Sequence, residues 1–118
     1  MNRRPKILLV EDDKAVSEDL CRRAQADMTV EVEESPEQAV DRMGFEDFDL
    51  VVMDSDHQSV LLTSAAITIF SRLRVPFLLF GHKPEGLNGA PVLARDDRDK
   101  FVQAVSDLLK KQAETAHA

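Results

Sequence analysis

Residues 48–54 read Phe48-Asp49-Leu50-Val51-Val52-Met53-Asp54, and this stretch decides the fold. Four successive apolar side chains, two of them β-branched, predict a strand buried on both faces, which is typical of a parallel sheet. Asp54 closes the strand at its carboxyl end, where open α/β sheets bind their ligands. Asp49 opens it at the opposite edge, so we expect a site to form at Asp54.

An earlier stretch has the same form. The apolar run 6–10 (Lys6-Ile7-Leu8-Leu9-Val10) is followed directly by Glu11, Asp12 and Asp13. If this strand lies beside the strand that ends at Asp54, several carboxylates meet at one edge of the sheet. A divalent cation would offset their mutual repulsion, so the pattern favours a cation-binding cluster.

Strands and helices alternate along the rest of the chain, which predicts an α/β fold with a doubly wound, five-stranded parallel sheet. The expected strands are 6–10, 29–33, 50–54, 75–81 and 91–95. The expected helices are 13–27, 35–44, 59–74 and 96–111, the last capped by Asp96 or Asp97. Strict alternation over 29–33 places that strand at a sheet edge. Pro84 and Gly86 exclude a long helix between the fourth and fifth strands, so the helix expected there, which would be the fourth of the fold, is shortened or missing.

The helix expected over 59–74 is unusually apolar. Its inner face is predicted to consist of Leu62, Ala66, Ile69, Phe70 and Leu73. The apolar character indicates either deep burial or a face that binds a partner protein.

Composition limits the function classes. The chain has 118 residues, which fits one domain over 1–118, with a folded core at about 5–111 and a polar tail or linker at 112–118. A net charge of −7 argues against direct binding to nucleic acid or to an anionic membrane. Cys21 is the single cysteine, so no intramolecular disulfide forms and a cytoplasmic location is expected.

The two strands with their terminal acids, 6–13 and 49–54, resemble the receiver domains of bacterial two-component response regulators, and the resemblance covers nearly the whole chain. It implies a flavodoxin-like fold. It also implies that Asp54 accepts a phosphoryl group from a histidine kinase or a phosphotransfer protein, and that the domain then acts on a protein output partner.

The same resemblance implies a Mg²⁺ site. Glu11 and Asp12 would bind the ion together with Asp54, and the backbone carbonyl of Asp56 would complete the ligand set. The chemistry requires such an ion, because a carboxylate that attacks a phosphoryl group meets its negative charge, and a hard cation on oxygen ligands neutralises both.

The chain departs from the receiver pattern at the residues that usually respond to phosphorylation. Gly81 stands in place of the Ser or Thr that closes the fourth strand, and Val92 stands in place of an aromatic residue on the fifth. Arg95 replaces the usual Lys, and the two side chains are not equivalent although Arg readily binds phosphate. We therefore expect an atypical receiver whose usual Ser/Thr–aromatic switch is absent.

Three other hypotheses remain open. The chain resembles, alternatively, a pseudo-receiver that binds a protein partner without phosphorylation. Asp54-Ser55-Asp56 also resembles the Asp-x-Asp motif of haloacid-dehalogenase-type phosphatases, but the other motifs of that enzyme class are not evident, so no enzyme activity is expected. His57, His82 and Asp56 form a weaker candidate for a transition-metal site. The sequence does not determine the oligomeric state, and a homodimer is left open.

Overall fold

The computed structural model describes residues 4–56, 59–83 and 89–117. Its strands are β1 (Lys6–Val10), β2 (Thr29–Glu33), β3 (Leu50–Asp54), β4 (Phe77–Phe80) and β5 (Val92–Leu93). Its helices are α1 (Lys14–Ala24), α2 (Pro36–Met43), α3 (Val60–Arg72) and α4 (Phe101–His117), with a short 3₁₀ helix, η1 (Arg95–Lys100), before α4.

The strands form one parallel sheet in the order β2-β1-β3-β4-β5. The two strands with terminal acids, β1 and β3, are therefore neighbours, with Val10 opposite Met53. The predicted five-stranded parallel sheet is confirmed, and β2 lies at an edge as expected.

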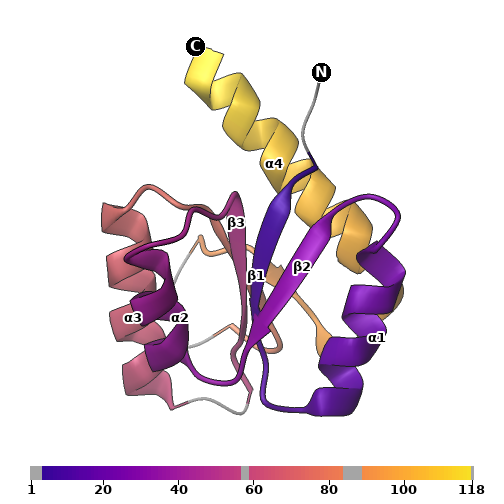
Figure 1. Ribbon diagram of the computed structural model, residues 1–118, viewed down its shortest axis with the longest axis horizontal. Coiled ribbons are helices and arrows are strands. Elements are labelled where there is room, and N and C mark those ends of the chain that lie inside the picture. Colours follow the sequence, from indigo (N-terminus) through magenta and orange to yellow (C-terminus); the bar gives the residue numbers. More distant parts are fainter. Residues whose placement is uncertain (1–3, 57–58, 84–88, 118) are drawn as a thin grey trace.

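Helices cover both faces of the sheet (Figure 1). On one face α1 and α4 pack against alternate residues of the central strands, with Leu20 and Phe101 fully buried. On the other face α2 and α3 contribute Ala39 and Phe70 to a second buried cluster. Every residue of β3 is buried, because this strand lies at the centre of the sheet and is covered on both sides.

Two N-caps place the helices at the ends of the strands. The Asp13 carboxylate accepts hydrogen bonds from the backbone of Ala15 at 3.0 Å and of Val16 at 3.3 Å, so α1 begins directly after the acids that follow β1. The Ser35 hydroxyl accepts from the backbone of Gln38 at 3.2 Å and begins α2. Helix α1 ends at Ala24, earlier than expected, although Met28 beyond it is buried.

The inner face of α3 differs from the prediction. The buried residues are Thr63, Ala66, Ile67 and Phe70, which repeat at intervals of three and four. Three residues expected inside are exposed instead: Leu62, Ile69 and Leu73. Periodicity misassigned the face because apolar side chains occupy nearly the whole circumference of this helix.

The C-terminal part of the chain also differs. Strand β5 is limited to Val92–Leu93, and Ala94, not Asp96 or Asp97, is the residue that precedes η1. Helix α4 continues to His117, so residues 112–117, expected as a polar tail, extend the helix. The chain is not helical at 81–83 or 89–91. The rest of the segment in which a shortened or missing helix was predicted, residues 84–88, lies outside the described part. No helix in the described residues is both long and apolar enough to cross a membrane.

Candidate functional site

An acidic cluster lies at the carboxyl edge of the sheet. This edge is at the bottom of Figure 1. Glu11 follows β1, Asp12 comes next, and Asp54 ends β3; one carboxylate oxygen from each lies within 4.8 Å of the others. Glu11 and Asp54 are buried, whereas Asp12 is exposed. The order of the strands explains the cluster, since parallel neighbours end at the same edge.

Arg95 lies against two of these acids. Its Nη1 donates to Glu11 Oε1 at 2.8 Å and to Asp54 Oδ1 at 3.0 Å. The guanidinium also stacks over the ring of Phe80, 4.8 Å from its centroid. Burial acts to lower the pKa of Arg95, but the hydrogen bond to Glu11 and the carboxylate charges raise it overall, so Arg95 is a permanent cation here.

Asp56 projects its carboxylate toward the end of β4. Its Oδ1 accepts from the His82 backbone N–H at 2.9 Å and lies 2.5 Å from His82 Nδ1. Its Oδ2 lies 3.9 Å from Arg95 Nε, and its own backbone N–H donates to Asp54 Oδ1 at 2.9 Å. The hydrogen bond from the His82 side chain is the main cause that lowers the pKa of Asp56, which is therefore ionised at neutral pH.

The predicted site residues thus fall into two groups. Glu11, Asp12, Asp54 and Arg95 come together at the edge of the sheet. Gly81 lies next to the Asp56 carboxylate, and Ser55 Oγ donates to the His82 carbonyl at 2.6 Å. His57, named with His82 and Asp56 as a transition-metal candidate, lies outside the described residues.

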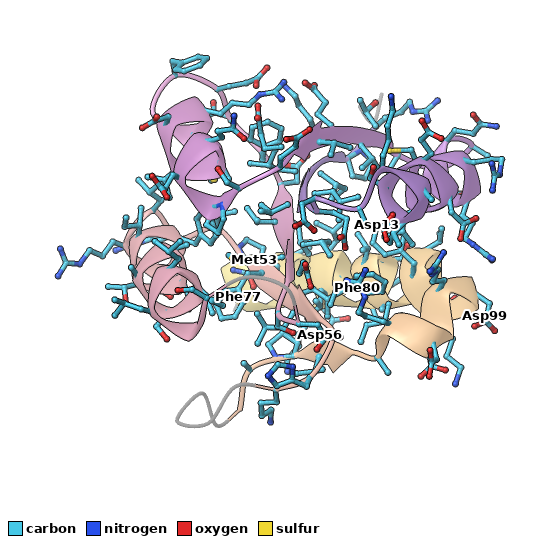
Figure 2. The ribbon with its side chains drawn as sticks, turned by 90° about the horizontal axis from the view of Figure 1, so that it is seen from below. Asp13, Met53, Asp56, Phe77, Phe80 and Asp99 are labelled. Carbon is cyan, nitrogen blue, oxygen red and sulfur yellow. The ribbon has the colours of Figure 1, made fainter. Side chains whose placement is uncertain are left out.

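Sequence reasoning expected a backbone carbonyl of Asp56 at the Mg²⁺ site and grouped the Asp56 side chain with His82 only as a transition-metal candidate. It did not predict the direct hydrogen bonds between the two residues. Gly81 was the available signal in the sequence, because a residue without a side chain at this position leaves room for the Asp56 carboxylate. Figure 2 views the molecule from this edge, with Asp56 labelled where the chain leaves β3. A pocket of about 560 Å³ opens here, lined by Asp56, His82, Arg95 and Asp96 among others.

The acidic cluster fits Mg²⁺ in its donor chemistry. Three carboxylates from Glu11, Asp12 and Asp54 provide hard oxygen ligands at one place, and exposed Asp12 leaves the cluster open to solvent. Arg95 already neutralises part of the charge on Glu11 and Asp54, so a bound cation would share these two acids with the guanidinium.

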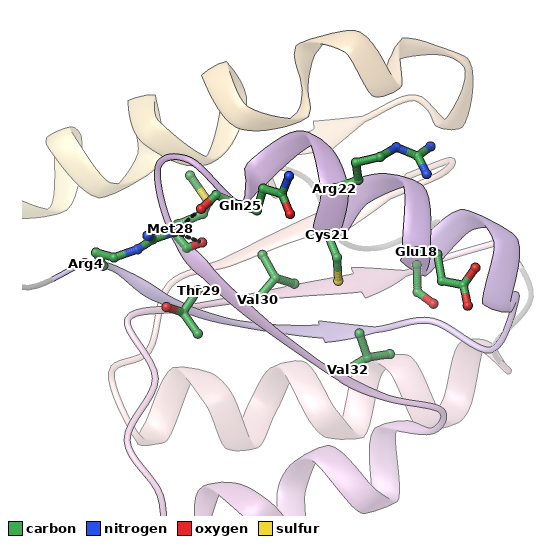
Figure 3. Close-up of a pocket in the computed structure, with 10 residues that line it drawn as sticks. Arg4, Glu18, Cys21, Arg22, Gln25, Met28, Thr29, Val30 and Val32 are labelled. Atoms are coloured by element: carbon green, nitrogen blue, oxygen red, sulfur yellow. Dashed lines mark hydrogen bonds between the residues drawn. The ribbon is translucent and has the colours of Figure 1, made fainter.

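A second hollow, of about 740 Å³, lies between α1 and β2, away from the acids (Figure 3). Arg4 closes one end by donating to the Met28 carbonyl at 2.9 Å. Cys21 is half-buried on its wall, where burial, and secondarily Glu18, raises the pKa of the thiol. The thiol therefore stays protonated at neutral pH.

Comparison with known proteins places the fold. No family model matches the sequence, and the search of curated proteins found no match. Solved structures do match, and the chain has the fold of response regulator receiver domains.

Three of these structures illustrate the likeness. The receiver domain of a putative Luxo repressor protein from Vibrio parahaemolyticus is 16% identical with a TM-score of 0.79, over 97% of this chain and 96% of that one. The N-terminal domain of a response regulator/sensory box/GGDEF protein from Carboxydothermus hydrogenoformans is 19% identical with a TM-score of 0.78, over 95% and 99%. A CheY-like receiver domain from Methanospirillum hungatei JF-1 is 18% identical with a TM-score of 0.77, over 96% and 99%. These identities establish the fold alone.

Proposed function

We propose that the chain is an atypical receiver domain in two-component or phosphorelay signalling, with Asp54 as the phosphoryl acceptor. The observation that carries the proposal is the position of Asp54: a buried carboxylate at the carboxyl end of the central strand, in contact with Arg95 and clustered with Glu11 and Asp12. The receiver fold of the similar structures supports it.

In the proposed reaction the donor is a phosphohistidine of a histidine kinase or a phosphotransfer protein. A carboxylate oxygen of Asp54 attacks phosphorus, the P–N bond breaks, and its electron pair remains on the imidazole nitrogen, leaving an aspartyl phosphate. Glu11 and Asp12, with the backbone carbonyl of Asp56, would hold Mg²⁺, which supplies positive charge against the transferred group. Arg95, which already donates a hydrogen bond to Asp54, would then bind the phosphoryl oxygens.

Incubation with acetyl phosphate and Mg²⁺ tests the proposal. We expect intact mass spectrometry to show one added phosphoryl group on the wild-type chain and none on Asp54→Asn. Asp12→Asn should reduce the extent of modification, because the exposed ligand of the ion is lost. Unmodified protein under every donor condition would instead favour the pseudo-receiver alternative, in which the domain binds its partner without phosphorylation.

We propose that phosphorylation of Asp54 changes the conformation of the rest of the domain only weakly. Gly81 has no hydroxyl to bond a phosphoryl oxygen, and Val92, 37% exposed on β5, has no ring to move. A ligand shifts a conformational equilibrium only through a difference in its contacts with the two states, and the usual source of that difference is missing here.

We accordingly expect a phosphoryl mimic, beryllium fluoride with Mg²⁺, to change amide chemical shifts near Glu11, Asp12 and Asp56 and to leave Val92 and α4 nearly unchanged. Two-dimensional NMR spectra with and without the mimic measure this. Large shifts along 91–109 would contradict the proposal and indicate another route from the site to the surface.

The phosphatase alternative receives less support. Asp56 would have to serve as its acid and base, but its Oδ1 is bonded to the backbone of His82. Turnover of a generic phosphate ester would favour that enzyme, whereas a receiver transfers once and stops. We also propose that residues 1–118 form a single domain, that the protein is cytoplasmic and that the domain acts on a protein output partner. Whether the chain forms a homodimer is left open.

A further inference from the structure

Gly81 and Asp56 share one space at the mouth of the site. Gly81 has φ +137°, a conformation that residues with side chains rarely adopt. A Cβ at this position would lie 2.7 Å from Asp56 Cγ and Oδ1 and 2.8 Å from Ser55 Oγ. Comfortable contacts between carbon atoms are about 3.5–4.0 Å, so a side chain at position 81 and the present Asp56 carboxylate exclude each other.

The Asp56 carboxylate uses donors that suit an oxyanion. It accepts the backbone N–H of His82, the first residue after Gly81, at 2.9 Å. It also lies 3.9 Å from Nε of Arg95, the guanidinium that bonds Asp54 through Nη1. A phosphoryl group on Asp54 would seek the same backbone donor and the same guanidinium, because its oxygens are also anionic acceptors. Asp56 therefore holds a backbone donor that a phosphoryl oxygen on Asp54 would also use.

We propose that Asp56 is an internal anion that occupies the His82 N–H, a donor that a phosphoryl group on Asp54 would use, and so slows the transfer of a phosphoryl group to Asp54. The inference rests on the proposed function of Asp54 and concerns a different residue. Removing the carboxylate exposes the His82 N–H and removes a negative charge that now lies 3.9 Å from Arg95 Nε. The space that a side chain at position 81 would need is opened at the same time.

The first test compares rates of modification by acetyl phosphate with Mg²⁺. In that reaction an Asp54 oxygen attacks phosphorus, the P–O bond to acetate breaks, and acetate leaves with the electron pair. We expect Asp56→Ala to gain the phosphoryl mass at least about tenfold faster than wild type, the equivalent of about 1.4 kcal/mol in the barrier. Asp96→Ala is the matched control, since Asp96 is an exposed acid on the rim of the same pocket, and its rate should stay near that of wild type.

The second test needs no phosphorylation. Gly81→Ala should lower the melting temperature in the wild-type background more than in the Asp56→Ala background, because only the first contains the clash with the carboxylate. The backbone strain at φ +137° and the contact with Ser55 are common to both backgrounds and cancel. If Asp56→Ala fails to fold, Asp56→Asn removes the charge with little change of shape and serves in the rate comparison.

The outcomes separate this inference from the proposed function. Equal rates for wild type and Asp56→Ala would overturn the role of Asp56 and leave Asp54 as the acceptor. If Asp56→Ala gains the phosphoryl mass and the wild-type chain does not, both the role of Asp56 and the role of Asp54 as acceptor are supported. No modification of any variant would overturn both, while a smaller effect of Gly81→Ala in the Asp56→Ala background would still establish that the two residues compete for one space.

Discussion

Replacing Arg95 with alanine is expected to lower the free energy of unfolding by about 3–5 kcal/mol, the range for breaking one side of a buried ion pair. Arg95 is 16% exposed, whereas the carboxylates of Glu11 and Asp54 that it bonds are 0% exposed. Without the guanidinium these two acids remain buried beside each other without a compensating cation from η1. Urea denaturation followed by circular dichroism measures the loss.

Arg98→Ala is the matched control. Arg98 also belongs to η1 and pairs with Asp19 at 3.3 Å, but its side chain is 38% exposed, so its loss should cost about 1 kcal/mol or less. Mg²⁺ provides a second comparison. If the ion binds the acids that Arg95 neutralises, it should raise the melting temperature of Arg95→Ala more than that of wild type. An Arg95→Ala variant as stable as Arg98→Ala would refute the view that Arg95 holds the cluster together.

The acidic cluster was predictable from sequence because it depends on strand order alone. Two apolar runs that both end in acids place Glu11, Asp12 and Asp54 at one edge once the sheet is parallel. The start of α2 was predictable for a local reason, since Ser35 bonds the backbone three residues ahead of it. Such features need no knowledge of how the layers pack.

Contacts between distant loops were not predictable in the same way. The Asp56 side chain, just after β3, accepts a hydrogen bond from the backbone N–H of His82, just after β4. The sequence grouped these residues as a transition-metal candidate, but no local pattern predicted this hydrogen bond. The buried face of α3 was misassigned because Leu62 and Ile69 are as apolar as the buried Phe70, so hydrophobicity could not choose between them. In both cases tertiary packing, and not the local pattern, decides the arrangement.

The second large effect is expected at Phe80. This side chain is 0% exposed and lies in the cluster with Phe101 and Val105 from α4. Its ring also stacks against the Arg95 guanidinium. Phe80→Ala should lower the free energy of unfolding by about 3–5 kcal/mol, since it leaves a cavity that the sheet and α4 cannot close. Chemical denaturation gives the value.

Phe77→Ala on the same strand separates burial from simple loss of an aromatic ring. Phe77 is only partly buried and packs on the opposite face, against the α2–α3 cluster, so its truncation should cost clearly less than that of Phe80. Phe80→Leu should keep most of the packing and lose the ring that contacts Arg95. The loss of that contact should lower the free energy of unfolding by about 0.5–2 kcal/mol. Equal losses for Phe77→Ala and Phe80→Ala would contradict this account, because the difference in burial between the two rings would then not determine the cost.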